Sequence, residues 1–204
     1  MRSFNSFRVM NTLFLLIGLL GLTSCAAGPG RYVLSEDSST ASPGEAVQNA
    51  RDFLAHRPNW KIDCSHFVLA CYHSGPMNYF LNHLKSHHNL TRDLNTYLTE
   101  LKTRRVEVKD IRPGDILIFD KTYDINRDGH IDEKDQMTHT AIVESYDHGL
   151  VDYIDASDDR KPPRIHRRRF SFFDDKINEV VARDPATGRK IRARETFRAA
   201  FSVH

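Results

Sequence analysis

The hydrophobic pattern of the chain changes once, about halfway along, and this change limits the folds that are open to it. In the first half apolar residues recur at helical spacing, as in the face formed by Ala46, Val47, Ala50, Phe53 and Leu54. In the second half they form short apolar or alternating runs that are separated by turn residues, at 106–108, 116–119, 140–145, 150–155, 180–182 and 191–194. Helices followed by strands predict an α+β fold, with helices packed on an antiparallel sheet.

The expected helices have recognisable first turns. Residues 42–45 (SPGE) match a capping box with proline at the first helical position. Asp63 is placed to cap a second helix over 64–72. A third, amphipathic helix is indicated by Leu94, Tyr97, Leu98 and Leu101.

The first 24 residues have the character of a signal peptide rather than of folded structure. Arg2 and Arg8 give a positive start, and the apolar run over 13–22 is too short to cross a hydrocarbon core of about 30 Å as a helix. The run ends in Leu-Thr-Ser before Cys25, which resembles the bacterial lipobox, a signal in which the cysteine is acylated and becomes the first mature residue. An ordinary secretory signal with an incidental Cys25 is the alternative. We expect a lipoprotein of the bacterial cell envelope, anchored to the membrane and facing the periplasm or the cell exterior.

The remaining chain divides into a spacer and one domain. Residues 25–42 are rich in Gly, Ser and Ala and predict a flexible spacer, and residues 43–204 suffice for a single core. The sequence has 29 Lys and Arg against 27 Asp and Glu, and loss of the two leader arginines makes the chain formally neutral. This balance argues against nucleic acid as a partner. We also expect a monomer.

Cys64 stands at the start of the second expected helix. The unpaired N–H groups and the helix dipole there favour a thiolate, and the same N–H groups could bind an oxyanion. Cysteine is also a common buried residue, and Cys71 is the expected structural cysteine. A helical separation of seven residues spans about 10.5 Å, too far for a disulfide between the two.

Four short motifs follow one another between residues 63 and 157 of the chain. They are D-C-S-H-F-V over 63–68, P-G-D over 113–115, H-T-A-I over 139–142 and I-D-A-S over 154–157. In this order they closely resemble the NlpC-type cell-wall peptidases, a papain-like family, over roughly residues 44–200. The resemblance implies a papain-like NlpC-type fold, with N-terminal helices on an antiparallel sheet, and hydrolysis of amide bonds in peptidoglycan stem peptides.

The resemblance also implies the roles of three residues. Cys64 is the nucleophile, His139 the base that takes its proton, and Asp155 the residue that orients the imidazole. A carboxylate at this third position would fix the tautomer of the ring. Asp152 and Glu144 lie nearby in the sequence and are alternatives to Asp155.

Two positions depart from the family pattern. His66 replaces a glycine, and Asp155 replaces the more usual histidine, asparagine or glutamine. His66 is about 200° around a helix from Cys64, so we expect a packing or surface residue. A non-catalytic envelope or peptidoglycan-binding module of the same fold, or an amidase or acyltransferase acting on another envelope substrate, are the alternative functions. Cys64 and His139 together favour an enzyme.

A calcium-loop motif precedes His139. Residues 124–135 (DINRDGHIDEKD) match the 12-residue EF-hand loop, with oxygen side chains at positions 1, 3, 5, 9 and 12 and glycine at position 6. The predicted ligands are Asp124, Asn126, Asp128, His130 through its carbonyl, Asp132 and Asp135. The loop is single and long helices do not flank it in the pattern, which favours a structural clamp over a sensor. An acidic surface turn is the alternative.

A basic cluster follows the last motif, with Arg164, His166, Arg167, Arg168 and Arg169. It fits either a solvated strand edge or a contact with an anionic glycan, lipid phosphate or substrate carboxylate.

Overall fold

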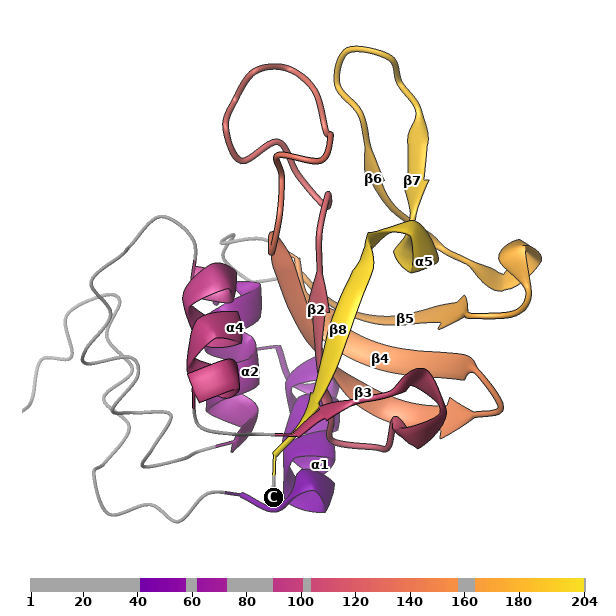
Figure 1. Ribbon diagram of the computed structural model, residues 1–204. Coiled ribbons are helices and arrows are strands. Elements are labelled where there is room, and N and C mark those ends of the chain that lie inside the picture. The colour runs from indigo at the N-terminus through magenta and orange to yellow at the C-terminus, as the bar shows by residue number, and fades with distance from the viewer. Residues whose placement is uncertain (1–40, 58–61, 73–89, 101–103, 158–163, 204) are drawn as a thin grey trace, which may run out of the picture. The chain divides into compact units, whose positions relative to one another are not determined.

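A six-stranded antiparallel sheet organises the fold in the computed structural model, which describes residues 41–57, 62–72, 90–100, 104–157 and 164–203 (Figure 1). Its strands are β1 (Arg104–Val106), β2 (Ile116–Phe119), β3 (His139–Asp147), β4 (Leu150–Ala156), β5 (Ile165–Ser171) and β8 (Phe197–Ser202). They lie in the order β1-β8-β2-β3-β4-β5, and each neighbouring pair is antiparallel. A separate hairpin consists of β6 (Val180–Arg183) and β7 (Lys190–Arg192).

The helices in the described part of the chain are α1 (Pro43–Ala55), α2 (Cys64–Tyr72), α4 (Leu90–Glu100) and α5 (Ala193–Thr196), with short 3-10 helices η1 (Val108–Asp110) and η2 (Asp175–Ile177). The first two begin directly after their predicted capping residues. The predicted capping box of α1 is present, because Ser42 and Glu45 each accept the other's backbone N–H. Helices and an antiparallel sheet together confirm the predicted α+β class.

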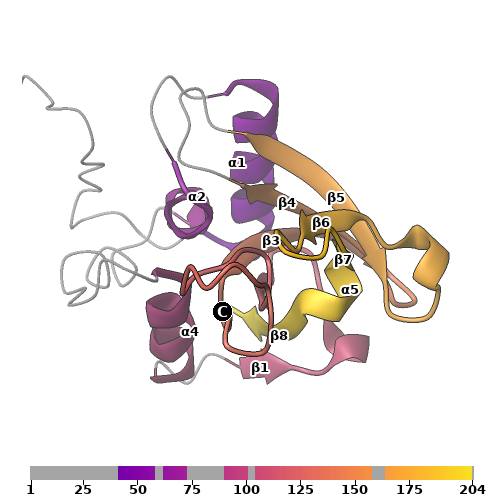
Figure 2. The same ribbon diagram turned by 90° about the horizontal axis from the view of Figure 1, so that it is seen from above.

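Both faces of the sheet are buried, in two separate hydrophobic clusters. Helices α1, α2 and α4 lie on the same side of the sheet in both ribbon views (Figures 1 and 2). Their apolar side chains pack against one set of strand residues, which includes Ile116, Ile118, Ile142 and Ile154. The intervening residues form the second cluster with Phe170 and α5, and they include Leu117, Ala141, Val143 and Tyr153. The two sets alternate because successive side chains of a strand point to opposite faces.

The P-G-D turn before β2 explains one glycine of the sequence. Gly114 has φ +93°, and a Cβ there would lie 2.5 Å from the Cβ of Pro43 at the start of α1. Its N–H donates to the carbonyl of Val143 at 2.8 Å, and its own carbonyl accepts from the hydroxyl of Tyr72. Only glycine combines this backbone conformation with so close a neighbour. The turn thereby holds β2 and β3 against the first two helices.

Some elements differ from the sequence-based prediction. Strands β5 and β8 are absent from the predicted strands, and the assignment of Val108 to a strand is wrong because it begins η1. Residues 193–196 form the short helix α5 instead of continuing a strand. In β5 a run of basic residues obscures the apolar alternation that indicates a strand. In β8 two consecutive small residues, Ala199 and Ala200, interrupt it.

Several predictions fall outside the described residues. These are the signal peptide, Cys25 and nearly all of the spacer, which lie within residues 1–40, and Leu101 of the third helix. All described residues belong to one compact unit. Among them, no helix combines the length and apolar character that a bilayer-crossing segment needs.

Candidate active site

Cys64 is the first residue of α2, and the residue before it caps the helix. Asp63 Oδ1 accepts the backbone N–H of His66 at 2.8 Å, and the Asp63 carbonyl accepts that of Phe67 at 2.9 Å. Asp63 is thus the N-cap that the sequence predicts. Cys64 is partly exposed, whereas Cys71 is fully buried and burial raises its thiol pKa well above the usual value. The Cys64 thiol therefore lies at the N-terminal end of the α2 dipole, which favours an anion.

His139 is the first residue of β3, and its ring contacts a carboxylate on β4. His139 Nε2 lies 2.8 Å from Asp155 Oδ2, and the two side chains are 14% and 2% exposed. This bond leaves the Nδ1 atom of the imidazole available for the thiol. The other two candidate carboxylates have different partners: Asp152 pairs with Ser145 and Arg169, and Glu144 pairs with Arg51 and Arg167. Asp155 is therefore the carboxylate that orients the ring in this geometry.

The thiol of Cys64 and the imidazole of His139 shift each other's pKa in opposite directions. Burial raises the pKa of Cys64, but the charge of His139 and a hydrogen bond with it bring that pKa below its usual value. Burial lowers the pKa of His139, but the thiolate and the Asp155 carboxylate raise it to about 10. The two groups titrate as a pair, and each shift is in the direction that favours a thiolate beside an imidazolium.

Arg168 on β5 is a second partner of Asp155, a role that its place in the basic cluster of the sequence does not indicate. Its Nε donates to Asp155 Oδ2 at 3.1 Å, and its side chain is only 17% exposed. Burial raises the pKa of Asp155, but His139 and Arg168 together lower it below its usual value, so the carboxylate stays ionised. Oδ1 of Asp155 is buried and has no hydrogen-bond partner in the described part of the chain.

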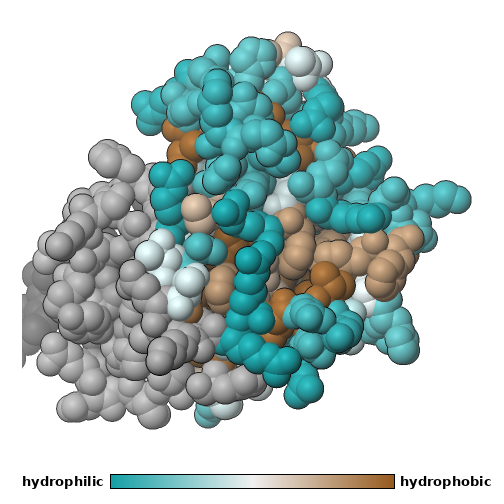
Figure 3. All heavy atoms as spheres, in the orientation of Figure 1, coloured by the Kyte–Doolittle hydropathy of each residue, from teal (hydrophilic) through white to brown (hydrophobic). Residues whose placement is uncertain are grey.

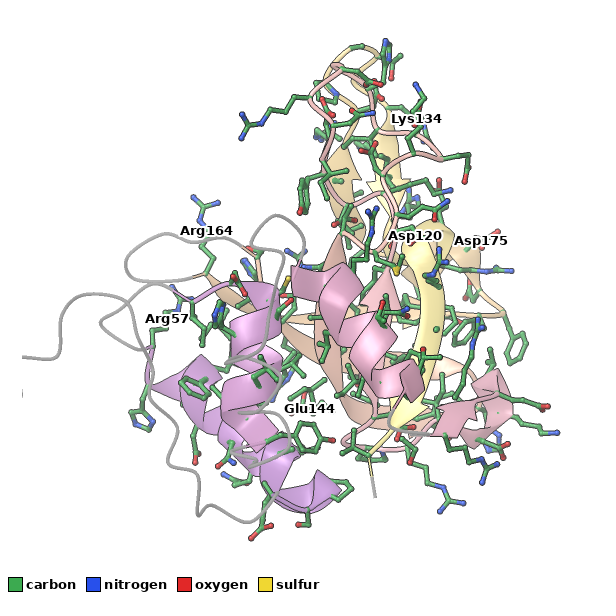
Figure 4. The ribbon with its side chains drawn as sticks, turned by 60° about the vertical axis from the view of Figure 1, so that its left-hand side comes forward. Arg57, Asp120, Lys134, Glu144, Arg164 and Asp175 are labelled. Atoms are coloured by element: carbon green, nitrogen blue, oxygen red, sulfur yellow. The ribbon has the colours of Figure 1, made fainter. Side chains whose placement is uncertain are left out.

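The basic cluster is divided between the two faces of β5. Arg167 bonds Glu144, which also accepts from Arg51 of α1 at 2.8 Å, and Arg169 bonds Asp152 at 2.6 Å. Figure 4 shows Glu144 between the helices and the sheet. Strand alternation places Arg168 on the opposite face, toward Asp155. Arg167 and Arg169 therefore form ion pairs with carboxylates of the sheet, and Arg168 forms one with the carboxylate of the candidate site. Figure 4 also labels Arg57, which follows α1, and Arg164, which precedes β5.

His66, which stands in place of the family's glycine, folds back on the helix cap. Its Nδ1 lies 2.8 Å from Asp63 Oδ2, and the two side chains are 43% and 38% exposed. The hydrogen bond with Asp63 raises the pKa of His66 above its usual value. His66 is a surface residue, which agrees with the expectation from its helical position.

The connection between β2 and β3 is narrow at its base, close to His139. The Asp120 carboxylate accepts the backbone N–H of Met137, and the Asp135 carbonyl accepts that of Lys121, each at 2.7 Å. Lys121 and Met137 have φ values of 54° and 52°. Residues with side chains adopt this left-handed conformation only where the surroundings impose it. The base is therefore a defined structure that ends two residues before His139.

The acidic ends of the 124–135 loop turn inward and bind its backbone. Asp124, at loop position 1, accepts the N–H groups of positions 5 and 6 at 3.2 and 2.8 Å. Asp135, at position 12, is fully buried and accepts the N–H groups of positions 2 and 9, both at 2.9 Å. The loop thus closes on itself through its first and last carboxylates.

The expected ligands of the loop supply oxygen atoms only, which suits Ca²⁺ better than a transition metal. The ammonium of Lys134, labelled in Figure 4, lies 3.3 Å from the Asp128 carboxylate and 3.8 Å from that of Asp132. Within the described ranges, no three His, Cys, Asp or Glu side chains gather as a metal-ion group. Calcium ligation by Asp124, Asn126, Asp128, His130, Asp132 and Asp135 stays a prediction.

The β6–β7 hairpin is attached to the loop by one buried carboxylate. Asp184 Oδ2 accepts the N–H of Ile131, loop position 8, at 2.8 Å, while Oδ1 accepts the N–H and hydroxyl of Thr187. The hydrogen bond from Ile131, followed by those from Thr187, lowers the pKa of Asp184 to about 2. Loop and hairpin form the hydrophilic end of the molecule in the view of Figure 3.

Comparisons of the chain with protein-family models, with curated proteins and with solved structures give no match. The resemblance to NlpC-type peptidases accordingly rests on the four motifs and on the geometry of Cys64, His139 and Asp155.

Proposed function

We propose that the protein is a cysteine peptidase or amidase of papain-like NlpC type, which hydrolyses amide bonds in peptidoglycan stem peptides. The observation that carries the proposal is the juxtaposition of a helix-start thiol, an imidazole and a buried carboxylate from three separate elements. Cys64, His139 and Asp155 come from α2, β3 and β4, and the pKa values of the thiol and the imidazole are shifted toward the ion pair. Burial alone would shift both pKa values the other way.

In the proposed reaction the Cys64 thiolate attacks the amide carbon, and the tetrahedral oxyanion is stabilised by the backbone N–H of Cys64 at the start of α2. The N–H groups of His66 and Phe67 already bind Asp63. His139 then gives its Nδ1 proton to the leaving amine, and a thioester remains. The same imidazole next removes a proton from water, which attacks the thioester and releases the acid and the thiolate. Asp155 keeps the ring oriented through both steps, as the third member of such triads does.

Purified peptidoglycan tests the activity directly. The full chain in detergent should release stem-peptide fragments that mass spectrometry identifies, and Cys64→Ala should abolish their release. Cys71→Ala is the matched control, because it removes a thiol of the same helix that is buried in the core. We expect Cys71→Ala to remain active with a lower melting temperature. Fragment release by folded Cys64→Ala would end the proposal, and binding without cleavage by the wild type would identify a binding module.

Membrane attachment is a separate part of the proposal. It rests on the lipobox-like sequence before Cys25, and it places the domain in the bacterial envelope at the end of a spacer. Metabolic labelling with a fatty-acid analogue should mark the wild type and not Cys25→Ser. Label that persists on Cys25→Ser would exclude acylation at this cysteine.

Calcium is proposed as a structural ion of the 124–135 loop, not as a participant in the reaction. The all-oxygen ligand set and the position of the loop next to the base before His139 support this role. Ordering of the loop would preserve the start of β3, and with it the placement of the imidazole.

A further inference from the structure

A buried hydroxyl from a third helix lies against the sulfur of Cys64. Thr91, in the first turn of α4, places its Oγ1 3.5 Å from Cys64 Sγ and 3.1 Å from Ser65 Oγ. Thr91 and Ser65 are 3% and 1% exposed. These contacts join α4 to the start of α2 at the nucleophile itself.

The protons of this cluster have a consistent arrangement when the sulfur is ionised. A thiolate accepts hydrogen bonds and donates none, whereas each hydroxyl brings one proton that needs an acceptor when buried. The Ser65 hydroxyl can then donate to Thr91 Oγ1, and the Thr91 hydroxyl to the sulfur. Both buried protons are used, and the negative charge gains a donor.

We propose that Thr91 is a further residue of the active site, whose hydroxyl donates to the Cys64 thiolate and is oriented by Ser65. This inference rests on the proposed function, because it assigns a role at the same nucleophile. His139 and Thr91 then supply two donors to one sulfur, from β3 and α4. The pKa of Cys64 agrees: burial raises it, His139 lowers it, and the hydrogen bond from Thr91 lowers it further.

The pH dependence of the alkylation rate measures the ionisation of Cys64, and the assay needs no substrate. Iodoacetamide reacts with thiolates, and peptide mass mapping of the full chain separates Cys64 from Cys25 and Cys71. The variants are Thr91→Val, which keeps the shape of the side chain, and Thr91→Ser, which keeps the hydroxyl. Thr99→Val is the matched control, because Thr99 lies on the exposed face of the same helix and its hydroxyl donates to the Asn95 carbonyl.

In Thr91→Val the rise of the alkylation rate of Cys64 with pH, the rising limb of the rate profile, should move to higher pH. At a given pH on that limb, alkylation should be about tenfold slower than in the wild type. A hydrogen bond to a charged group is worth on the order of one tenfold step in an equilibrium constant. The high-pH plateau should not fall, because a thiol of higher pKa is the stronger nucleophile once ionised. Thr91→Ser should restore the wild-type limb, and Thr99→Val should keep it.

Two results would separate this inference from the proposed function. If the alkylation rate of wild-type Cys64 rises only at the pH where an ordinary thiol ionises, both would be overturned, because the pKa of Cys64 would then not be lowered. A low-pH wild-type limb that is unchanged in Thr91→Val would overturn the role of Thr91 alone. If Thr91→Val does not fold, as judged by circular dichroism, Thr91→Ala is read in the same way and an unchanged limb counts equally against the role.

Discussion

Replacing Asp124 and Asp128 by asparagine removes two negative charges from the 124–135 loop and keeps side chains of the same size. The loop has five carboxylates, and four of them belong to predicted ligands: Asp124, Asp128, Asp132 and Asp135. The ammonium of Lys134 lies 3.3 Å from the Asp128 carboxylate. Without an ion the double variant should be close to the wild type in stability, because relief of like-charge repulsion opposes the loss of backbone hydrogen bonds that Asp124 and Asp128 accept within the loop. With calcium the wild type should be clearly the more stable of the two.

The size of the calcium effect follows from mass action. An ion present at about 100 times its dissociation constant stabilises the folded state by about 2.7 kcal/mol. For a domain of this length each kcal/mol raises the melting temperature by roughly 2–4 °C, so the wild type should gain about 5–10 °C. The base of the loop links Asp135 to the residues before His139. Calcium should therefore also raise the rate of fragment release from peptidoglycan, since displacement of a catalytic group by about 1 Å can cost about a hundredfold.

Calorimetry in chelator and in millimolar calcium measures this prediction, and isothermal titration gives the affinity. A variant with Glu107→Gln and Asp147→Asn is the control, because it removes two carboxylates whose side chains are 74% and 81% exposed outside the loop. That variant should keep the full calcium response. Absence of calcium binding at millimolar concentration, or binding that changes neither melting temperature nor rate, would refute the clamp and leave an acidic loop.

Gly114→Ala should destabilise the protein more than Gly188→Ala in urea unfolding. Both have positive φ, which costs alanine about 1–2 kcal/mol, but only the Gly114 variant also meets Pro43, and overpacking adds about 1–3 kcal/mol. Equal losses would show that the close approach to α1 is unimportant. Asp184→Asn should lower the melting temperature at pH 6, because the N–H of Ile131 favours the ionised carboxylate. A depressed pKa stabilises the fold above about pH 4. The difference from the wild type should therefore shrink as the pH falls toward about 2, and a constant difference would contradict this linkage.

Local signals predicted the starts of the first two helices to the residue. The Ser42–Glu45 capping box and the Asp63 cap act within three positions of the chain, so the sequence contains both partners of each hydrogen bond. The same holds for the turn before β2. Cys64 and His139 could be selected because each opens an element whose start has a clear pattern.

Contacts between distant segments could not be predicted in the same way. Arg168 is one of three consecutive arginines, and only the pairing of β4 with β5 distinguishes it from its neighbours. Thr91 reaches Cys64 across the packing of α2 and α4, which no spacing in the sequence encodes. The sequence does allow Asp155 to be preferred over Asp152 as the carboxylate beside His139, because strand alternation puts these two residues on opposite faces of β4.

The base of the β2–β3 connection has a consequence for how such a protein can change over time. Phe119 and His139 face each other across the strand ladder, and Thr138 N–H donates to the Phe119 carbonyl at 2.9 Å, so the inserted segment leaves and re-enters the sheet at one place. Loop closure grows costlier by only about 0.6 kcal/mol for each doubling of length. Segments of other lengths can therefore be exchanged here while the sheet is kept. This makes the connection a place beside His139 where a different ion-binding or peptide-binding loop could be inserted and bring the proposed active site under a different control.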